Sequence, residues 1–422
     1  MALTMLLTMA LPAAAANRFE DVERADWYYA AVTTMANEGV VSGYPDGTFR
    51  PNDTLTQGEC LTLVLQAAGS GKQTSAGAHW AEGYLTYGKQ QGVIAAGETV
   101  ALDEPVTRGT AARWLVKALG LELKTEDNPF TDTTDIYAVS LYHAGLAAGY
   151  ETENGLQFRP EGTLTRAEMC SLLFQKFTQG KFQYGSHWIP IAENLNRNPY
   201  VAKNFRNHNN FLSYQGMDTE VGIDVSYYQG DVDWQQVKDS GVSFVIIRLG
   251  YRGYGSGKLV IDPKFKEYID GASAVGLKIG IYFFSQAIST EEAEEEAQLV
   301  LENIRGYQID YPVVFDWEII GVSTARTDGM TADEVTACAT QFCDTVAAAG
   351  YTPAVYFTKY LGYRRYHLGA LADYDFWFAE YSSQPSCYYE FQIWQYSDSA
   401  NIPGISGRVD LNISFKKYGE TA

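Results

Sequence analysis

Cysteine is scarce in this chain of 422 residues, which holds only Cys60, Cys170, Cys338, Cys343 and Cys387. None of them belongs to a Cys-x-x-Cys pair or to a Cys/His cluster, so the sequence predicts neither a zinc site nor a disulfide framework. The five histidines show no spacing typical of metal ligands. We therefore expect no metal and no other cofactor.

Positive charge is also in short supply. Lysine and arginine total 31 against 51 aspartates and glutamates, which gives a formal net charge of -20. A protein that binds nucleic acid or an anionic membrane surface needs a basic footprint. Neither partner is expected, although a local basic patch is compatible with this balance.

Long apolar runs are missing as well. The one candidate, residues 1–16 (MALTMLLTMALPAAAA), is too short to cross a bilayer as a helix. It is typical of the apolar region and cleavage site of a secretory signal peptide, which predicts a secreted protein without membrane insertion. The basic residues that usually precede such a run are absent, so either the signal is atypical or the true start lies upstream.

The first half of the chain contains an internal repeat of about fifty residues. Repeat one carries FED at 19–21, GYPDGTFRP at 43–51 and LTQGE at 55–59, and the third copy echoes it between 130 and 168. The second copy is degraded but keeps VTRG at 106–109. Thr-x-x-Glu before an apolar run predicts a helix-capping box, so each unit is expected to be helix, turn-rich loop, helix.

These motifs resemble S-layer homology repeats, in three copies over residues 17–69, 76–122 and 127–178. The resemblance implies an α-helical module that binds secondary cell-wall polysaccharide and holds the protein at the cell wall or S-layer. In the family the arginine of T-R-A-E contacts the anionic polymer, and Arg108 and Arg166 occupy that position here, whereas repeat one has Gln57. The alternative is that these arginines are solvated and the Thr and Glu residues only cap helices.

Residues 179–219 are predicted to be a linker, because they are rich in asparagine and lack a clear period. Their tyrosine, tryptophan and phenylalanine content suggests partial packing rather than free coil. The remaining chain, residues 220–416, alternates strand-like and helix-like runs, as in α/β domains. We predict a multidomain protein whose second part is an irregular TIM-like (β/α) barrel with few helices in its final third. Its eight strands are expected near residues 222–226, 243–249, 277–284, 311–315, 353–357, 375–381, 391–396 and 408–413.

Two carboxylates close one of these strands, at Asp316 and Glu318. Residues i and i+2 of a strand point to the same side, so both should project from the strand's C-terminal end, where barrels of parallel strands carry catalytic groups. Two carboxyls so close cannot both ionise freely, and a carboxyl that keeps its proton can protonate a leaving oxygen in glycoside cleavage. Taken alone, Asp-x-Glu is also compatible with a solvated acidic turn.

Five ordered motifs carry a second resemblance: GIDVS at 222–226, IGIYFF at 279–284, FDWE at 315–318, IWQY at 393–396 and VDLN at 409–412. Together they resemble glycoside hydrolase family 25, the Chalaropsis-type lysozymes. The family implies hydrolysis of the β-1,4 bond between N-acetylmuramic acid and N-acetylglucosamine in peptidoglycan. It also implies a substrate-assisted mechanism in which the 2-acetamido group attacks the anomeric carbon.

Site residues follow from that resemblance by position. Glu318 would be the acid/base, and Asp316 would orient the acetamido group. Asp224 and Asp410 match two further active-site aspartates. Four side chains are expected to line the groove: Tyr282, Tyr356, Trp394 and Gln395.

Two alternatives stay open at this point. A non-catalytic wall-binding or S-layer protein could retain the fold, although all four carboxylates are present. A hydrolase of another N-acetylated glycan, such as chitin, would carry the same motifs.

Overall fold

The computed structural model describes residues 19–75, 77–209 and 211–419. It separates into two compact units, Met1–Pro190 and Ile191–Ala422. The predicted signal peptide, residues 1–16, lies outside the described residues. Within them, no helix has both the length and the apolar character needed to span a bilayer.

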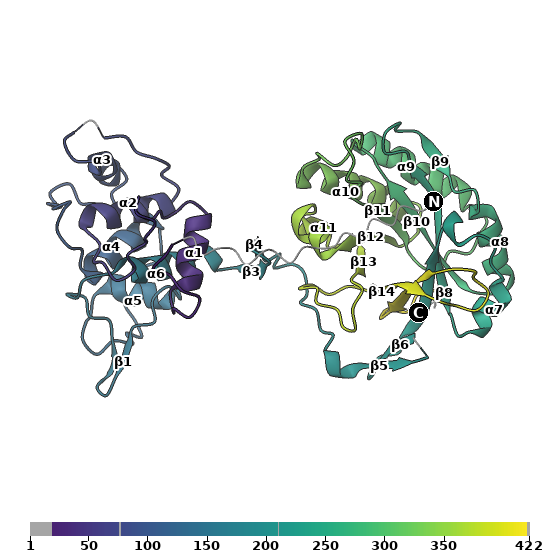
Figure 1. Ribbon diagram of the computed structural model, residues 1–422, viewed down its shortest axis with the longest axis horizontal. Coiled ribbons are helices and arrows are strands. Elements are labelled where there is room, and N and C mark those ends of the chain that lie inside the picture. Colours follow the sequence, from purple (N-terminus) through teal and green to yellow (C-terminus); the bar gives the residue numbers. More distant parts are fainter. Residues whose placement is uncertain (1–18, 76, 210, 420–422) are drawn as a thin grey trace. The chain divides into compact units, whose positions relative to one another are not determined.

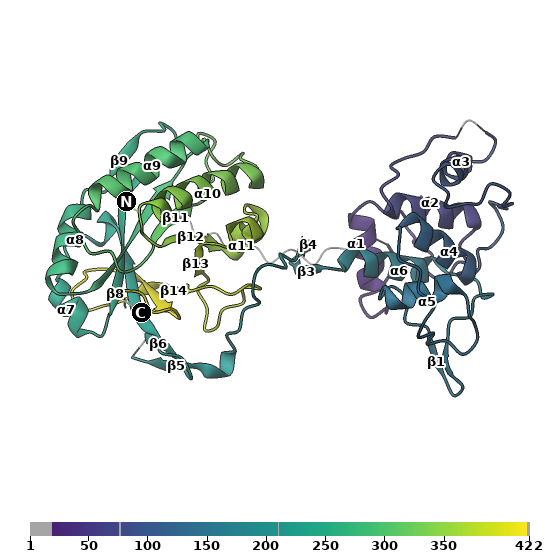
Figure 2. The same cartoon turned by 180° about the vertical axis from the view of Figure 1, so that it is seen from behind.

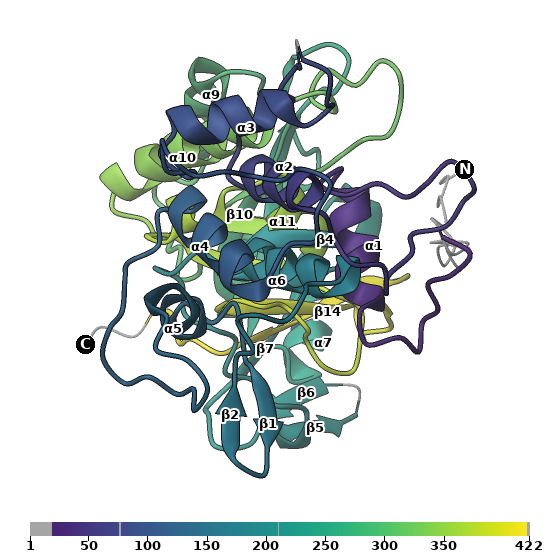
Figure 3. The same ribbon diagram turned by 90° about the vertical axis from the view of Figure 1, so that its left-hand side faces the viewer.

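The N-terminal unit consists of three helix pairs, one for each predicted repeat (Figure 3). The second helix of every pair begins after a threonine whose hydroxyl accepts a backbone N–H. The predicted capping boxes at Thr56 and Thr165 are present, while in the second repeat Thr110 replaces the glutamate and only half of the box forms. The pairs are α1 (Tyr29–Asn37) with α2 (Gln57–Ala67), α3 (Glu82–Gln90) with α4 (Arg108–Ala118), and α5 (Ile136–His143) with α6 (Arg166–Thr178).

A closed ring of three backbone hydrogen bonds joins the repeats. Leu55 N–H donates to Leu164 O at 2.9 Å, Leu164 N–H to Val106 O at 3.3 Å, and Val106 N–H to Leu55 O at 2.9 Å. All three side chains are buried in one shared core. The repeats therefore form a single pseudo-three-fold unit with a common core rather than three independently folded units. Two hairpins complete this unit, β1 (Tyr150–Thr152) with β2 (Gly155–Gln157) and β3 (Lys181–Tyr184) with β4 (His187–Pro190).

The C-terminal unit is a closed barrel of eight strands, as the sequence predicts (Figure 1). Strand β15 is antiparallel to β14 and β7, the other neighbouring pairs are parallel, and pairing of β8 with β10 closes the ring. A short β9 (Leu259–Ile261) extends β8 on the outside. The strands are β7 (Glu220–Val225), β8 (Phe244–Arg252), β10 (Lys278–Ser285), β11 (Val313–Trp317), β12 (Pro353–Thr358), β13 (Asp375–Ala379), β14 (Ile393–Ala400) and β15 (Val409–Ser414).

Helices surround the outside of the barrel, as the view from behind also shows (Figure 2). Among the described residues none lies between β13 and β15, so the expected lack of helices near the end is present. The short α11 after β12 was not anticipated from the sequence. The helices are α7 (Trp234–Asp239), α8 (Phe265–Ala274), α9 (Thr290–Asn303), α10 (Ala332–Ala348) and α11 (Lys359–Arg364), with 3-10 turns η1 (Ala202–Asn204), η2 (Tyr227–Gln229) and η3 (Leu368–Leu371).

Most of the stretch predicted as a linker, 179–219, is folded onto the barrel. We call residues 191–219 the strap; it contains β5 (Phe205–His208) and β6 (Phe211–Tyr214). Tyr200 stacks on Phe415 with ring centroids 3.8 Å apart, and its hydroxyl donates to Phe391 O at 2.7 Å. The aromatic residues of this stretch bury apolar area against the barrel, which a free linker would leave in water.

Candidate active site

The four predicted carboxylates meet at one end of the barrel. Asp224 lies near the C-terminal end of β7, Asp316 near that of β11, and Glu318 directly after β11. Asp410 joins them because β15 runs the opposite way, so the start of β15 lies beside the end of β7, with Asp410 opposite Asp224. The alternation of side chains along each strand decides which side of the strand each carboxylate faces. Closure of the barrel then brings the strand ends together.

Asp224 is a buried carboxylate surrounded by donors. Its Oδ2 accepts the side-chain amides of Asn412 at 2.7 Å and Gln395 at 2.9 Å, and Asp410 provides a further side-chain hydrogen bond. Burial raises the pKa of Asp410 to about 9, with the charge of Asp224 as the next cause, so Asp410 keeps its proton at neutral pH and donates it. Burial also raises the pKa of Asp224, while its three donors favour the ionised form.

The Asp-x-Glu pair is close together, as the strand geometry predicts. Burial raises the pKa of Glu318 to about 7, and the charge of Asp224 adds to the effect. Burial and then the charges of Glu318 and Asp224 raise the pKa of Asp316 well above its ordinary value. Asp316 Oδ1 is buried and has no hydrogen-bond partner in the protein. The site therefore offers a proton donor near neutral pH beside an acceptor atom that the protein does not use.

Arg248 is a site residue that sequence reasoning missed. It lies on β8 opposite Tyr282 of β10, and its Nη2 is 2.7 Å from Asp262, a buried aspartate. Its positive charge acts against the rise in the pKa of Asp316. An arginine inside the apolar run at 243–249 was the available signal, because a buried guanidinium needs a charged partner.

The predicted groove aromatics divide into two groups. Tyr282 and Tyr356 both contact the ring of Trp377 edge-on, at 6.0 and 4.8 Å, and Tyr356 OH donates to Gln395 Oε1 at 3.0 Å. Trp394 is fully buried, its Nε1 donates to Glu380 O, and its ring packs on Phe205 of the strap. The prediction that Trp394 lines the groove is therefore wrong: its ring is buried, and its neighbour Gln395 faces the carboxylates instead.

Trp377, on β13, supports the site. Its Nε1 donates to Asn412 Oδ1 at 2.8 Å, and the amide nitrogen of Asn412 donates to Asp224. Phe283, next to Tyr282, is fully buried on the other face of β10. Within the described part of the chain, no group of three or more histidine, cysteine, aspartate or glutamate side chains could hold a metal ion.

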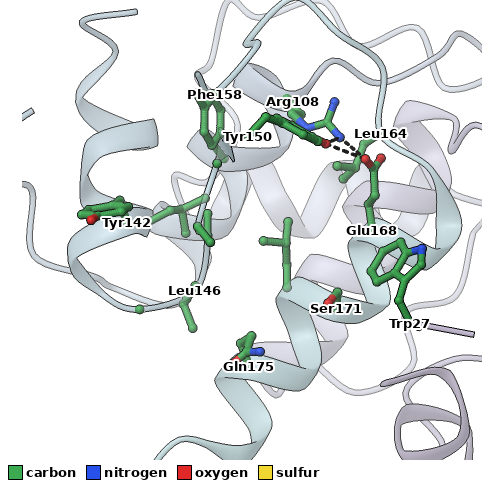
Figure 4. Close-up of a pocket in the computed structure, with 17 residues that line it drawn as sticks. Trp27, Arg108, Tyr142, Leu146, Tyr150, Phe158, Leu164, Glu168, Ser171 and Gln175 are labelled. Carbon is green, nitrogen blue, oxygen red and sulfur yellow. Dashed lines mark hydrogen bonds and ion pairs between the residues drawn. The ribbon is translucent and has the colours of Figure 1, made fainter. Parts of the chain in front are cut away.

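In the N-terminal unit, Arg108 lines a cavity of about 610 Å³ between the second and third repeats (Figure 4). Its guanidinium contacts the hydroxyl of Tyr150 and the carboxylate of Glu168, and it donates to Thr163 O at 3.1 Å. Trp27, which is 66% exposed, lies on the same cavity. Arg108 thus joins two repeats and also forms part of a half-open aromatic pocket.

Arg166 occupies the matching position between the third and first repeats, in the wall of a cavity of about 300 Å³. It donates to Phe49 O at 2.8 Å and Ser42 O at 3.0 Å, and its guanidinium lies over the ring of Tyr44. The exposed Trp80 lies on this cavity as Trp27 does on the other. The two tryptophans were not recognised from the sequence as pocket residues.

The third inter-repeat position differs from these two. Gln57 replaces the arginine, and its Oε1 accepts the backbone N–H of Ala101 at 3.2 Å. The second repeat also has no tyrosine matching Tyr44 and Tyr150. This junction is closed by hydrogen bonds between neighbouring repeats and carries no cationic side chain at the matching position.

Comparison with known proteins agrees with the division of the chain into an N-terminal unit of repeats and a C-terminal barrel. Residues 223–405 match the model of glycosyl hydrolases family 25, and residues 18–60 and 129–170 match the S-layer homology domain. The second predicted repeat, 76–122, stays a prediction.

Among curated proteins, the chain is 32% identical to the autolytic lysozyme of Clostridium acetobutylicum over 193 residues, covering 45% of this chain and 54% of that protein. It is 28% identical to lysozyme M1 of Streptomyces globisporus over 204 residues, covering 45% of this chain and 66% of that protein. The S-layer protein sap of Bacillus anthracis is 25% identical over 190 residues, covering 41% of this chain and 23% of that protein. The chain thus spans about half to two thirds of the two lysozymes.

A similar solved structure is that of the modular autolysin LytC from Streptococcus pneumoniae, which is 26% identical, covers 50% of this chain and 51% of that chain, and has a TM-score of 0.42. The family 25 match includes Asp224, Asp316 and Glu318, while Asp410 lies just past its end. The S-layer homology matches coincide with the two repeats that keep the full motifs. The chain thus combines a segment that matches glycosyl hydrolases family 25, at 223–405, with two that match the S-layer homology domain, at 18–60 and 129–170.

Proposed function

We propose that the barrel is an N-acetylmuramidase of the lysozyme type. It would hydrolyse the β-1,4 bond between N-acetylmuramic acid and N-acetylglucosamine in peptidoglycan. The observation that carries this proposal is the pair of Glu318, with a pKa of about 7, and Asp316, with a buried and unpartnered Oδ1. The pair lies at the strand ends where TIM-like barrels carry catalytic groups.

In the first step, Glu318 donates its proton to the glycosidic oxygen. The carbonyl oxygen of the substrate's 2-acetamido group bonds to the anomeric carbon, and the bond to the leaving sugar breaks with its electron pair moving to the protonated oxygen. The product is a cyclic oxazolinium ion. Asp316 Oδ1 accepts the acetamido N–H and so holds the acetamido group in position for attack.

In the second step, the ionised Glu318 takes a proton from water. The resulting hydroxyl bonds to the anomeric carbon, and the carbon–oxygen bond of the oxazolinium breaks with its electrons returning to the acetamido group. Glu318 regains its proton, and the configuration at the anomeric carbon is retained. Asp224 and Asp410 hold substrate hydroxyls, and the charge of Asp224 helps to keep the pKa of Glu318 high.

We also propose that the N-terminal unit binds secondary cell-wall polysaccharide and holds the secreted enzyme at the cell wall or S-layer. The two cavities lined by Arg108 and Arg166 support this, since each combines a cation with a tyrosine and an exposed tryptophan. A protein of net charge -20 gains little attraction to an anionic wall from its overall charge. Localisation would therefore depend on these cavities.

The test is a digest of purified peptidoglycan by wild type and by Glu318→Gln, analysed by mass spectrometry. Fragments with reducing N-acetylmuramic acid ends from wild type, and none from the variant, are expected. If wild type releases nothing while both proteins still bind walls, the hydrolase proposal fails for this substrate. Release from chitin oligomers instead would reassign the substrate to another N-acetylated glycan.

A further inference from the structure

Tyr381, directly after β13, combines an exposed ring with a fixed hydroxyl. Its side chain belongs to the exposed aromatic residues at 54% exposure. Its hydroxyl nevertheless donates to Gln395 Oε1 at 3.2 Å. A free surface tyrosine samples several rotamers, whereas a ring held at its far end presents one face in one orientation.

The side-chain amide of Gln395, which accepts that hydroxyl, has only one possible orientation. Its Nε2 donates to Asp224 Oδ2 at 2.9 Å and contacts Asp410 Oδ2 at 3.4 Å, while its Oε1 accepts from Tyr356 and Tyr381. Turning the amide over would place the carbonyl oxygen against Asp224, a carboxylate that can only accept. The amide has two donors and two acceptor positions, and the protein uses all of them. Gln395 therefore has no free group for substrate.

The backbone beneath the ring is fixed as well. Glu380 N–H donates to Gln395 O at 3.1 Å, and the Glu380 carboxylate accepts Ser386 N–H at 2.6 Å and Ser386 Oγ–H at 2.7 Å. Lys359 Nζ is 2.5 Å from the same carboxylate. The loop after β13 is thus tied at its base, so the ring position is set from both ends.

The carboxyl groups of the site lie close to this ring. Desolvation and then the charges of Asp410, Asp224 and Glu318 raise the pKa of Tyr381 well above its ordinary value. A pyranose has one face made of C–H groups and a rim of hydroxyls. An aromatic face beside carboxyl oxygens suits such a ring, because the C–H face can pack on the aromatic face while the hydroxyls donate to the carboxyls.

We propose that Tyr381 is the stacking platform for a pyranose ring of the N-acetylated glycan beside the cleaved bond, and that Gln395 is its positioning residue. This inference rests on the proposed function of the barrel. It assigns Gln395 to the protein's own network rather than to substrate. It also assigns the stacking role, which the buried Trp394 cannot fill, to a residue one strand earlier.

The experiment compares full-chain variants on soluble peptidoglycan strands freed of secondary polysaccharide, so that the N-terminal unit adds no binding. Tyr381→Ala should raise KM by about tenfold with little change in kcat, because the lost contact is worth on the order of 1 kcal/mol. Tyr381→Trp keeps an aromatic face and should retain most of the wild-type affinity. Tyr351→Ala is the matched control, since Tyr351 is partly exposed just before β12, at the other end of the barrel.

Gln395→Leu should raise KM at least as much as Tyr381→Ala, because it also removes a donor to Asp224. The double variant should have the same KM as Gln395→Leu alone, since the platform is already lost in that variant. An unchanged KM for Tyr381→Ala in an active series would overturn the inference while leaving the proposed function intact. If wild type cleaves nothing, the proposed function fails. Titration of the same strands into wild type and Tyr381→Ala then decides the platform, and equal affinities would overturn it too.

Discussion

Asp224 and Asp410 face each other across β7 and β15, and the protonated Asp410 donates a hydrogen bond to the Asp224 carboxylate. Because Asp410 keeps its proton at neutral pH, Asp224 is the member of this pair that can carry negative charge. That charge also acts on Glu318, whose pKa it helps to raise. A single buried pair thus connects the hydrogen-bond network of Gln395 and Asn412 to Glu318, the proposed acid.

The activity should fall as the pH rises through about 7. Glu318 must be protonated to donate to the leaving oxygen, and its pKa is raised to about 7 by burial and by Asp224. Asp224→Asn removes the negative charge, so the pKa of Glu318 should drop and the alkaline limb should move to lower pH. A pH profile of kcat/KM for both proteins measures this. An unmoved limb in Asp224→Asn would show that this charge does not set the pKa of Glu318.

Asp316→Asn should stabilise the protein while abolishing activity. The folded-state pKa of Asp316 is raised, so the folded state holds this proton more tightly than the unfolded one, and stability is lost as the pH rises above about 4. Asparagine does not titrate. The gain in the free energy of unfolding should therefore be larger at pH 7 than at pH 4. Chemical denaturation at both pH values, beside the exposed Asp373→Asn, checks the sign; equal gains at the two pH values would contradict it.

Two inter-repeat positions, not three, should bind wall polymer. Arg108→Ala and Arg166→Ala should each weaken binding of purified secondary polysaccharide, while Gln57→Ala, the matched change at the third position, should have no effect. The binding should weaken with salt, because the contacts are charged. Calorimetric titration gives affinity and stoichiometry, and circular dichroism confirms that the variants fold. A loss of binding in Gln57→Ala would require a third site.

The strap should contribute strongly to the stability of the barrel. Tyr200→Ala removes the stacking on Phe415 and the hydrogen bond to Phe391 O, which should cost about 3 kcal/mol. Met217→Ala changes an exposed residue of the same strap and should be close to neutral. Thermal unfolding of the full-chain variants provides the comparison. A Tyr200→Ala protein as stable as wild type would mean that the contact of Tyr200 with the barrel adds nothing to its stability.

Much of the site could be predicted from the sequence because its determinants are local. Alternation along β11 is enough to put Asp316 and Glu318 on one side, and Thr-x-x-Glu is enough to begin α2 and α6. Eight apolar runs in an α/β pattern predict the barrel. Each of these signals lies within a few neighbouring residues.

Other features depend on pairings between distant segments. Gln395 and Asp224 are separated by 171 positions, and only barrel closure directs the amide to that carboxylate rather than to substrate. Trp394 is buried because Phe205 of the strap packs against it. The aromatic residues of the strap have no periodicity from which their contacts with the barrel could be predicted. The sequence by itself determined which groups are candidates for the chemistry, through local conformation and motif. The tertiary structure alone decided which of them face each other, because hydrogen bonding and desolvation depend on neighbours brought together from far along the chain.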